Sequence, residues 1–172
     1  MSALEGASPY IRAESNLAAL GLDQMAASLP DYMRMVSEGD LEFCAALAEM
    51  TAAEVAAKEA RVTRQRIRSA GFPYEKTLAD FDWSFQPSVP RARVEELATL
   101  RFMERAENVL LVGSPGVGKT HLAIAVGIEA VRARREVRFM DCARLVDDLR
   151  DAQSRGILKK RLQYYAHSKL LI

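Results

Sequence analysis

One octapeptide, Gly113-Ser-Pro-Gly-Val-Gly-Lys-Thr120, constrains the fold of this 172-residue chain more than any other segment. It fits the pattern G-x-x-x-x-G-K-[ST], a loop whose backbone N–H groups surround a phosphate. Its glycines allow conformations closed to other residues and let phosphate approach the backbone closely. The apolar run Val109–Val112 precedes it, and an apolar helix is predicted over 119–133. The sequence therefore predicts a phosphate-binding loop between a buried strand and a helix.

Each residue type in this loop has a chemical reason. Lys119 supplies a positive charge for the β- and γ-phosphates, and the Thr120 hydroxyl is the expected Mg²⁺ ligand. The N-terminal end of the following helix adds partial positive charge. We therefore predict ATP and Mg²⁺ as ligands, with a phosphate site formed by Gly113, Ser114, Pro115, Gly116, Val117, Gly118, Lys119 and Thr120.

The residues after the loop alternate between strand and helix patterns. Val137–Met140 is predicted as a second strand, 143–153 as a helix, and Leu170–Ile172 as the start of a third strand. This order indicates the beginning of an open α/β fold with a parallel sheet.

The first 71 residues show only helical patterns. We predict a helix over 15–29 that Pro30 ends, and another that starts at a capping box, Thr51–Glu54, and reaches about Ser69. These residues are predicted to form a small all-α N-terminal domain, 1–71.

Residues 72–92 are rich in both proline and aromatic side chains. We predict an extended linker that packs on the following domain rather than a solvated one, with Trp83 among the packing residues. One helix is predicted over about 91–106, and residues 93–172 are assigned to the α/β domain.

Charge is unevenly distributed along the chain. Residues 1–57 carry nine acids against Arg12 and Arg34, whereas the stretch that follows is basic. The basic stretch indicates either an anionic partner or a solvated helix face with an i,i+4 pair between Glu54 and Lys58. The candidate DNA contacts are Lys58, Arg61, Arg64, Arg66 and Arg68, and, in a second patch, Lys159, Lys160 and Arg161.

The remaining composition argues for a protein of the cytoplasm. No apolar run approaches the roughly 20 residues of a membrane span, and no signal peptide is recognisable. Cys44 and Cys142 lack metal-ligand spacing and are predicted to be small core residues in a reducing compartment. His121 is predicted to have a packing or helix-surface role rather than a catalytic one.

Three stretches together resemble the IstB-like ATP-binding family. They are Phe72–Pro87 (FPYEKTLADFDWSFQP), Glu95–Phe102 and Asn108–Ala125, and the similarity extends over residues 15–172. This family comprises insertion-sequence helper ATPases of the AAA+ group, related to DnaC-type helicase loaders. The resemblance implies a P-loop NTPase fold of AAA+ type, present here as an incomplete parallel sheet.

The resemblance also implies function, including partner or DNA contacts by the N-terminal domain, residues 1–71. It implies an ATP-dependent, double-stranded-DNA-binding oligomer that directs the transposase of the same element to its target, with Phe81 and Phe85 near the adenine. The acids that follow the third strand in this family would come after Ile172, so no catalytic residue is predicted within the chain. We expect nucleotide binding without turnover from these 172 residues.

Three alternatives stay open at this stage. A helicase loader shares the same motifs, a small-molecule kinase shares the loop alone, and a non-catalytic remnant of a mobile element would bind DNA independently of ATP. In this group the strands flanking Val109–Val112 come later in the chain than Ile172. We therefore expect the 172 residues to be unstable or to self-associate through open sheet edges.

Overall fold

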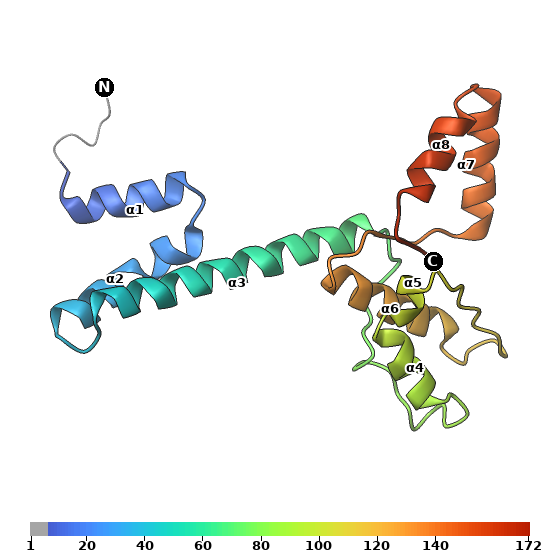
Figure 1. Ribbon diagram of the computed structural model, residues 1–172, viewed down its shortest axis with the longest axis horizontal. Coiled ribbons are helices and arrows are strands. Elements are labelled where there is room, and N and C mark those ends of the chain that lie inside the picture. The colour runs from blue at the N-terminus through green and yellow to red at the C-terminus, as the bar shows by residue number, and fades with distance from the viewer. Residues whose placement is uncertain (1–6) are drawn as a thin grey trace. The chain divides into compact units, whose positions relative to one another are not determined.

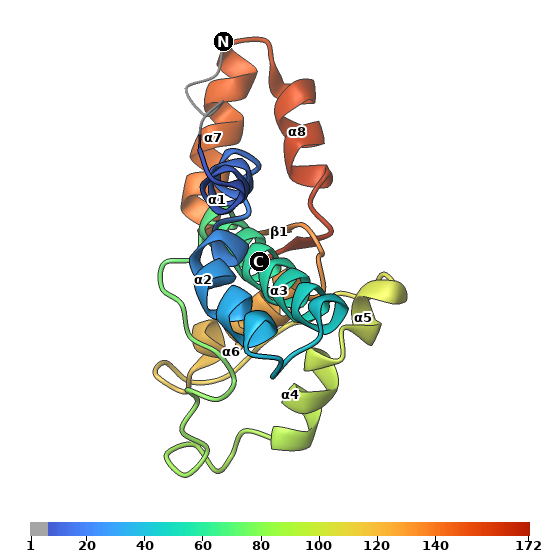
Figure 2. The same ribbon diagram turned by 90° about the vertical axis from the view of Figure 1, so that its left-hand side faces the viewer.

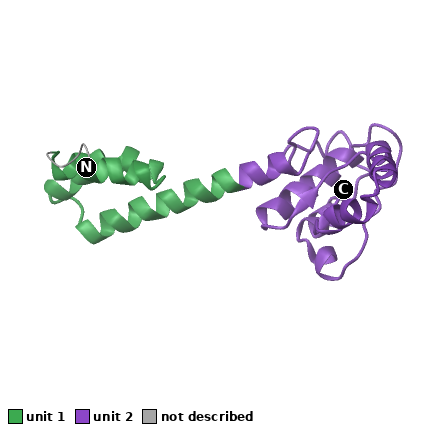
Figure 3. Cartoon of the chain, turned by 90° about the horizontal axis from the view of Figure 1, so that it is seen from above, with its two compact units in different colours: residues 1–62 green, residues 63–172 purple. Residues whose placement is uncertain are grey.

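The computed structural model describes residues 7–172. The chain divides into two compact units, residues 1–62 and 63–172 (Figure 3), with the division inside a single helix. The expected functional boundary at residue 71 stays a prediction. The elements (Figure 1) are α1 Pro9–Ala19, α2 Asp23–Ser37, α3 Phe43–Ser69, α4 Arg91–Ala98, α5 Arg101–Glu104, α6 Lys119–Arg132, β1 Val137–Arg138, α7 Cys142–Ser154, α8 Leu158–Ala166 and β2 Leu170–Leu171.

The helix expected over 15–29 is wrong in its bounds. Two helices cover this region, because Gly21 adopts φ +67° and ends α1, with the Leu22 N–H donating to the Leu17 carbonyl at 2.9 Å. Pro30 then lies inside α2 rather than after it. An interior proline costs about 3 kcal/mol. Packing of one α2 face, where Met25 is buried, offsets that cost.

The capping box expected at Thr51 is also wrong. Helix α3 runs through this position, and the Thr51 hydroxyl donates to the carbonyls of Leu47 and Ala48 within the helix. Glu54 is buried, and its Oε2 accepts the backbone N–H groups of Gln24 and Met25 at 2.8 and 3.0 Å. Glu54 therefore caps the N-terminus of α2, whose own N-cap residue offers no side-chain acceptor.

Residues 72–90 contain no helix or strand, and two aspartates organise their centre; α4 begins at Arg91, within the 72–92 segment of the prediction. Asp80 accepts the N–H and hydroxyl of Thr77, both at 2.7 Å. Asp82 accepts the N–H and hydroxyl of Ser84 at 2.9 and 2.6 Å. These hydrogen bonds hold the pKa of each carboxyl below its ordinary value. Between the two turns the Phe81 ring is buried.

The single helix expected over 91–106 is divided in two. Leu100 adopts φ +62°, which separates α4 from the short α5. A left-handed backbone at a branched residue is unfavourable, but Leu100 packs against the buried core cluster of the second unit.

Helix α6 is the centre of that core cluster, and its predicted extent is confirmed to within a residue. Ile124, Ile128 and Val131 are almost wholly inaccessible to solvent. β1 and β2 pair in parallel, Val137 with Leu170 and Arg138 with Leu171. This confirms the order of the second and third predicted strands, although both are short.

Residues 109–112 do not form the buried strand that was expected. Within the described chain they carry no strand assignment, and Leu110 and Val112 are 85% and 82% exposed. A lone extended segment lacks the ladder partners that define a strand. Between this segment and β2 lies an open groove of about 170 Å³, whose lining includes Leu111, Leu122 and Leu171.

Cys44 and Cys142 are both exposed, so the prediction that they are core residues is wrong. Each sits at the first turn of a helix, where only part of the circumference is covered. No helix among residues 7–172 is long and apolar enough to cross a membrane.

Candidate phosphate-binding site

The glycine-rich loop turns directly into the N-terminus of α6. Gly116 and Gly118 have φ +84° and +87°, conformations that side chains disfavour, and Gly118 is the N-cap of the helix. The first intrahelical bond is Leu122 N–H to Gly118 carbonyl at 2.9 Å. The amides before Leu122 therefore have no partner within the helix and can donate to an anion.

Backbone carbonyls of the loop hold the Lys119 side chain over it. Its Nζ donates to the carbonyls of Gly113 and Ser114 at 3.0 and 2.8 Å. The charge thus lies at the mouth of the loop, close to the helix amides. Thr120, the next residue, is exposed, so its hydroxyl is accessible to a Mg²⁺ ion that accompanies a nucleotide.

The Phe81 ring forms one wall of the loop. A Cβ placed on Gly118 would lie 2.6 Å from Phe81 Cε2, so the ring rests on the backbone of that glycine. Phe81 also stacks edge-on against Trp83 and His121, with ring centroids 4.7 and 5.2 Å apart. Phe81 is buried in a cluster with Val94 and Leu122, and Trp83 packs against this cluster. Phe85, by contrast, is 72% exposed.

His121 links the aromatic linker to α6. Its Nε2 lies 2.9 Å from the Thr77 carbonyl oxygen, which can only accept, so Nε2 carries the hydrogen in this contact. The packing role predicted for His121 is confirmed.

The basic residues of α3 are all exposed, as a solvated face or a DNA-contacting face requires. Arg61 lies 3.2 Å from Asp23 and so has an acidic partner within its own unit. No ion pair between Glu54 and Lys58 occurs, because Glu54 instead caps α2. The other candidate DNA contacts on α3 are Lys58, Arg64, Arg66 and Arg68.

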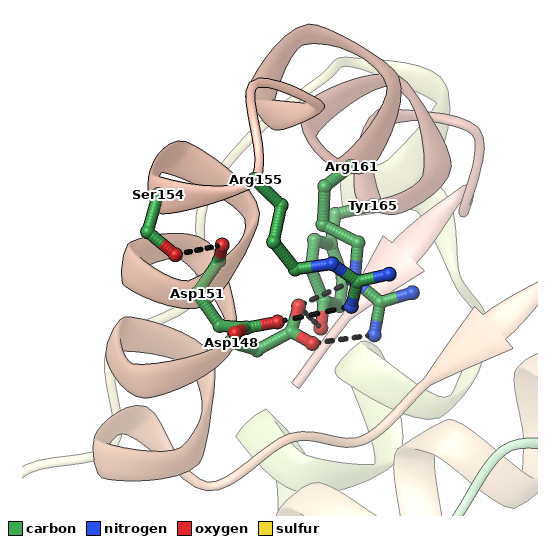
Figure 4. Close-up of polar contacts among 6 residues, drawn as sticks. All are labelled: Asp148, Asp151, Ser154, Arg155, Arg161 and Tyr165. Atoms are coloured by element: carbon green, nitrogen blue, oxygen red, sulfur yellow. Dashed lines mark hydrogen bonds and ion pairs between the residues drawn. The ribbon is translucent and has the colours of Figure 1, made fainter.

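The second basic patch lies on a helical hairpin formed by α7 and α8, which run side by side (Figure 1 and Figure 2). Figure 4 shows the polar cluster that joins them. Arg161 Nε and Nη2 lie 2.5 and 2.7 Å from the two carboxylate oxygens of Asp148, and the Tyr165 hydroxyl donates to the same carboxylate at 2.7 Å. The Arg161 hydrogen bond, then that of Tyr165, lowers the pKa of Asp148.

Because of this cluster, Arg161 differs from the two lysines of the second patch. The Arg161 guanidinium is bound to Asp148, and Lys159 and Lys160 are exposed on the same helix. Arg138 stacks on the Tyr164 ring, 3.9 Å from its centroid, and fixes the end of α8 next to β1.

Sequence reasoning missed three structurally important residues. Glu54 was predicted to cap the helix that contains it, whereas it caps α2. Asp148 and Gly127 were not identified at all. A Cβ on Gly127 would lie 2.6 Å from Ile172 and 2.9 Å from Phe72. A glycine in the middle of an otherwise apolar helix was the available signal for such a close approach.

A glycine-rich loop, a lysine held at its mouth and a helix N-terminus immediately after it define the chain as a P-loop protein. Residues 15–172 match the family model described as IstB-like ATP binding protein, and the chain belongs to this family.

Curated relatives agree with this membership. The chain is 35% identical over 163 residues to a Bacillus thuringiensis subsp. berliner protein named as the ATP-binding protein of insertion sequence IS232, covering 95% of this chain and 65% of the relative. It is 37% identical over 156 residues to the corresponding protein of IS21 from Pseudomonas aeruginosa, covering 91% and 59%. It is 37% identical over 153 residues to that of IS5376 from Geobacillus stearothermophilus, covering 89% and 61%. The chain thus spans about three fifths of the length of these relatives.

Proposed function

We propose that this chain is the nucleotide-binding part of an insertion-sequence helper ATPase. It would bind ATP at Gly113–Thr120 and, with ATP bound, associate with double-stranded DNA and with the transposase of the same element. The observation that carries the proposal is the loop itself, in which two glycines with positive φ lead into α6, whose first residue is Lys119 and whose N-cap, Gly118, has no side-chain acceptor. Membership of the IstB-like family supports the connection to an insertion sequence.

The residues present suit a magnesium nucleotide. Lys119 would neutralise the terminal phosphates, and the amides at the start of α6 would donate to them. The Thr120 hydroxyl would hold Mg²⁺, which supplies charge compensation between the phosphates. The Phe81 ring, resting on Gly118, would be positioned beside the bound nucleotide.

The DNA-binding part of the proposal depends on exposed cations. Lys159 and Lys160 project from the α7–α8 hairpin, whose geometry is fixed by the bond between Arg161 and Asp148. The exposed arginines of α3 offer a second surface. Cations that meet phosphates displace counterions, so such binding weakens with salt in proportion to the number of contacts.

The experiment is DNA binding by the full chain, measured as a function of salt with and without MgATP. If four cations meet phosphates, log K should fall with log[salt] at a slope of about −3.6, and replacing Lys159 and Lys160 by Gln should reduce that slope by about 1.8. Arg105→Gln, which removes an exposed charge on a different segment, is the matched control. A flat salt response would reject the DNA role. Binding that ignores ATP would favour a non-catalytic remnant instead.

A further inference from the structure

The first unit contains an apolar groove that the nucleotide-binding function does not use. It lies among α1, α2 and α3, has a volume of about 290 Å³, and apart from Asn16 and Tyr32 its lining is apolar. Its floor is buried, since Met25, Ala46 and Met50 are each less than a tenth exposed. The groove is therefore a formed feature of the three-helix packing and not a gap between loosely placed helices.

Large apolar side chains stand exposed around this groove. Leu20 and Phe43, which come from α1's C-terminal end and α3's first turn, are 70% and 62% exposed. Met33 of α2 and Leu47 of α3 are nearly half exposed. Single exposed apolar residues are ordinary, but several large ones around one concave apolar surface are typical of an interaction site.

The shape and the charge of the surroundings indicate the kind of partner. A groove between helices accepts the apolar face of an amphipathic helix, with anchors at i, i+3 or i+4, and i+7. Acids adjoin the lining positions in sequence more often than bases do. Glu14, Asp31, Glu42 and Glu49 stand next to a lining residue, against Arg12 and Arg34, and Arg34 already lies in ion pairs with Asp31 and Glu38. Acids also outnumber bases nine to two in residues 1–57. A helix with basic residues beside its apolar face would meet complementary charge here.

We propose that this groove is a docking site for an amphipathic helix of another protein, with an apolar face flanked by Lys or Arg. The site is independent of the phosphate loop in its residues. A helper protein that binds nucleotide in one unit can in this way hold a protein partner with the other. The inference therefore adds to the proposed function without resting on the identity of that partner.

The first experiment measures binding of fluorescently labelled 18-residue peptides to the full chain. The test peptide carries Leu at i, i+4, i+7 and i+11 and Lys on the flanking positions. One control peptide has the same composition with the Leu positions scrambled, and the other keeps the Leu spacing but replaces Lys by Glu. We expect the test peptide to bind at least about tenfold more tightly than either control. Equal binding of the test and scrambled peptides would overturn the proposal.

Variants of the chain locate the site. Leu20→Asp should weaken test-peptide binding by about tenfold or more, because it places a charge among the apolar anchors. Val55→Asp, on α3 but outside the groove and 57% exposed, is the matched control and should leave binding unchanged. Both positions are exposed, so neither change should unfold the chain. Equal effects of the two variants would also overturn the proposal.

The remaining variant tests the charge argument. Glu14→Lys should weaken binding of the Lys peptide and strengthen that of the Glu peptide. If instead the chain self-associates, and Leu20→Asp abolishes this while the peptides do not bind, a second copy fills the groove and the proposal is wrong. ATP affinity measured on the same proteins separates the two hypotheses, since a natural chain that binds ATP but not the test peptide counts only against the groove.

Discussion

At the scale of single residues, the phosphate loop depends on glycines that do two different things. Gly116 and Gly118 both have positive φ, but only Gly118 also lies against a ring, that of Phe81. Backbone strain and steric contact can therefore be separated by comparing the same substitution at the two positions.

Alanine at Gly116 should cost about 1–2 kcal/mol in the free energy of unfolding, because the space around it is open and only the left-handed backbone is unfavourable. Gly118→Ala should cost more, since the new Cβ also displaces Phe81. Chemical denaturation measures both costs. In a chain that already carries Phe81→Ala, the cost of Gly118→Ala should fall towards that of Gly116→Ala. Identical costs at Gly116 and Gly118 would mean that the ring does not rest on the loop.

At the scale of secondary-structure elements, two carboxylates join helices that are separate in sequence. Glu54 of α3 caps α2, and Asp148 of α7 binds Arg161 and Tyr165 of α8. Both contacts connect positions that no local pattern relates.

Replacing Glu54 by Leu should lower the free energy of unfolding by about 1–3 kcal/mol, since the buried N–H of Met25 and the partly buried N–H of Gln24 lose their acceptor. Glu54→Gln keeps an acceptor oxygen and should cost less. Glu49→Gln, at an exposed position five residues earlier on α3, should change stability by less than about 0.5 kcal/mol. Thermal and chemical unfolding followed by circular dichroism would measure all three, and a neutral Glu54→Leu would contradict the capping role.

The Asp148 contact predicts a pH dependence. Because its pKa is lowered in the folded chain, the charged carboxylate stabilises the fold above its unfolded pKa of about 4, and this stabilisation is lost as pH falls through the lower folded value. Asp148→Asn should therefore be less stable than the natural chain at pH 7 and should approach it below about pH 4. Asp147→Asn, at a mostly exposed neighbour, is the control. A stability difference that persists unchanged at low pH would rule out the carboxylate as the cause.

Elements whose signals are local were predictable from sequence, and those that need distant partners were not. Helix α6 was predicted to within a residue, because the loop glycines mark its start and its apolar residues continue to Val131. Thr51 and Glu54 matched a local capping box, but the Glu54 carboxylate instead accepts backbone N–H groups at the start of α2. The division at Leu100 follows from tertiary packing. The turn of the glycine-rich loop into α6 was predictable, whereas the ring of Phe81 on Gly118 required the fold.

At the scale of the whole chain, the second unit exposes an unpaired apolar segment beside an open groove. Leu110 and Val112 are exposed, and β2 is paired on one side by β1. Extended apolar backbone without a partner strand is a template for pairing with another chain.

We therefore expect the 172-residue chain to self-associate with increasing concentration in sedimentation experiments. Leu110→Lys should suppress this, because a charge on an open edge opposes strand pairing. Val62→Lys, at an exposed apolar position on α3, should not. A natural chain that is monomeric at every concentration would show that the open edge is not used.

The most direct test of the central claim is the equilibrium affinity of the full chain for a fluorescent ATP analogue with Mg²⁺, compared with that of Lys119→Ala. The account predicts binding by the natural chain and a loss of about tenfold or more in the variant, with an unchanged circular dichroism spectrum, because a charge-assisted contact to phosphate contributes about 1.5–3 kcal/mol. Equal affinities for the natural chain and the variant, or no binding by the folded natural chain, would contradict the claim that Gly113–Thr120 is a nucleotide site.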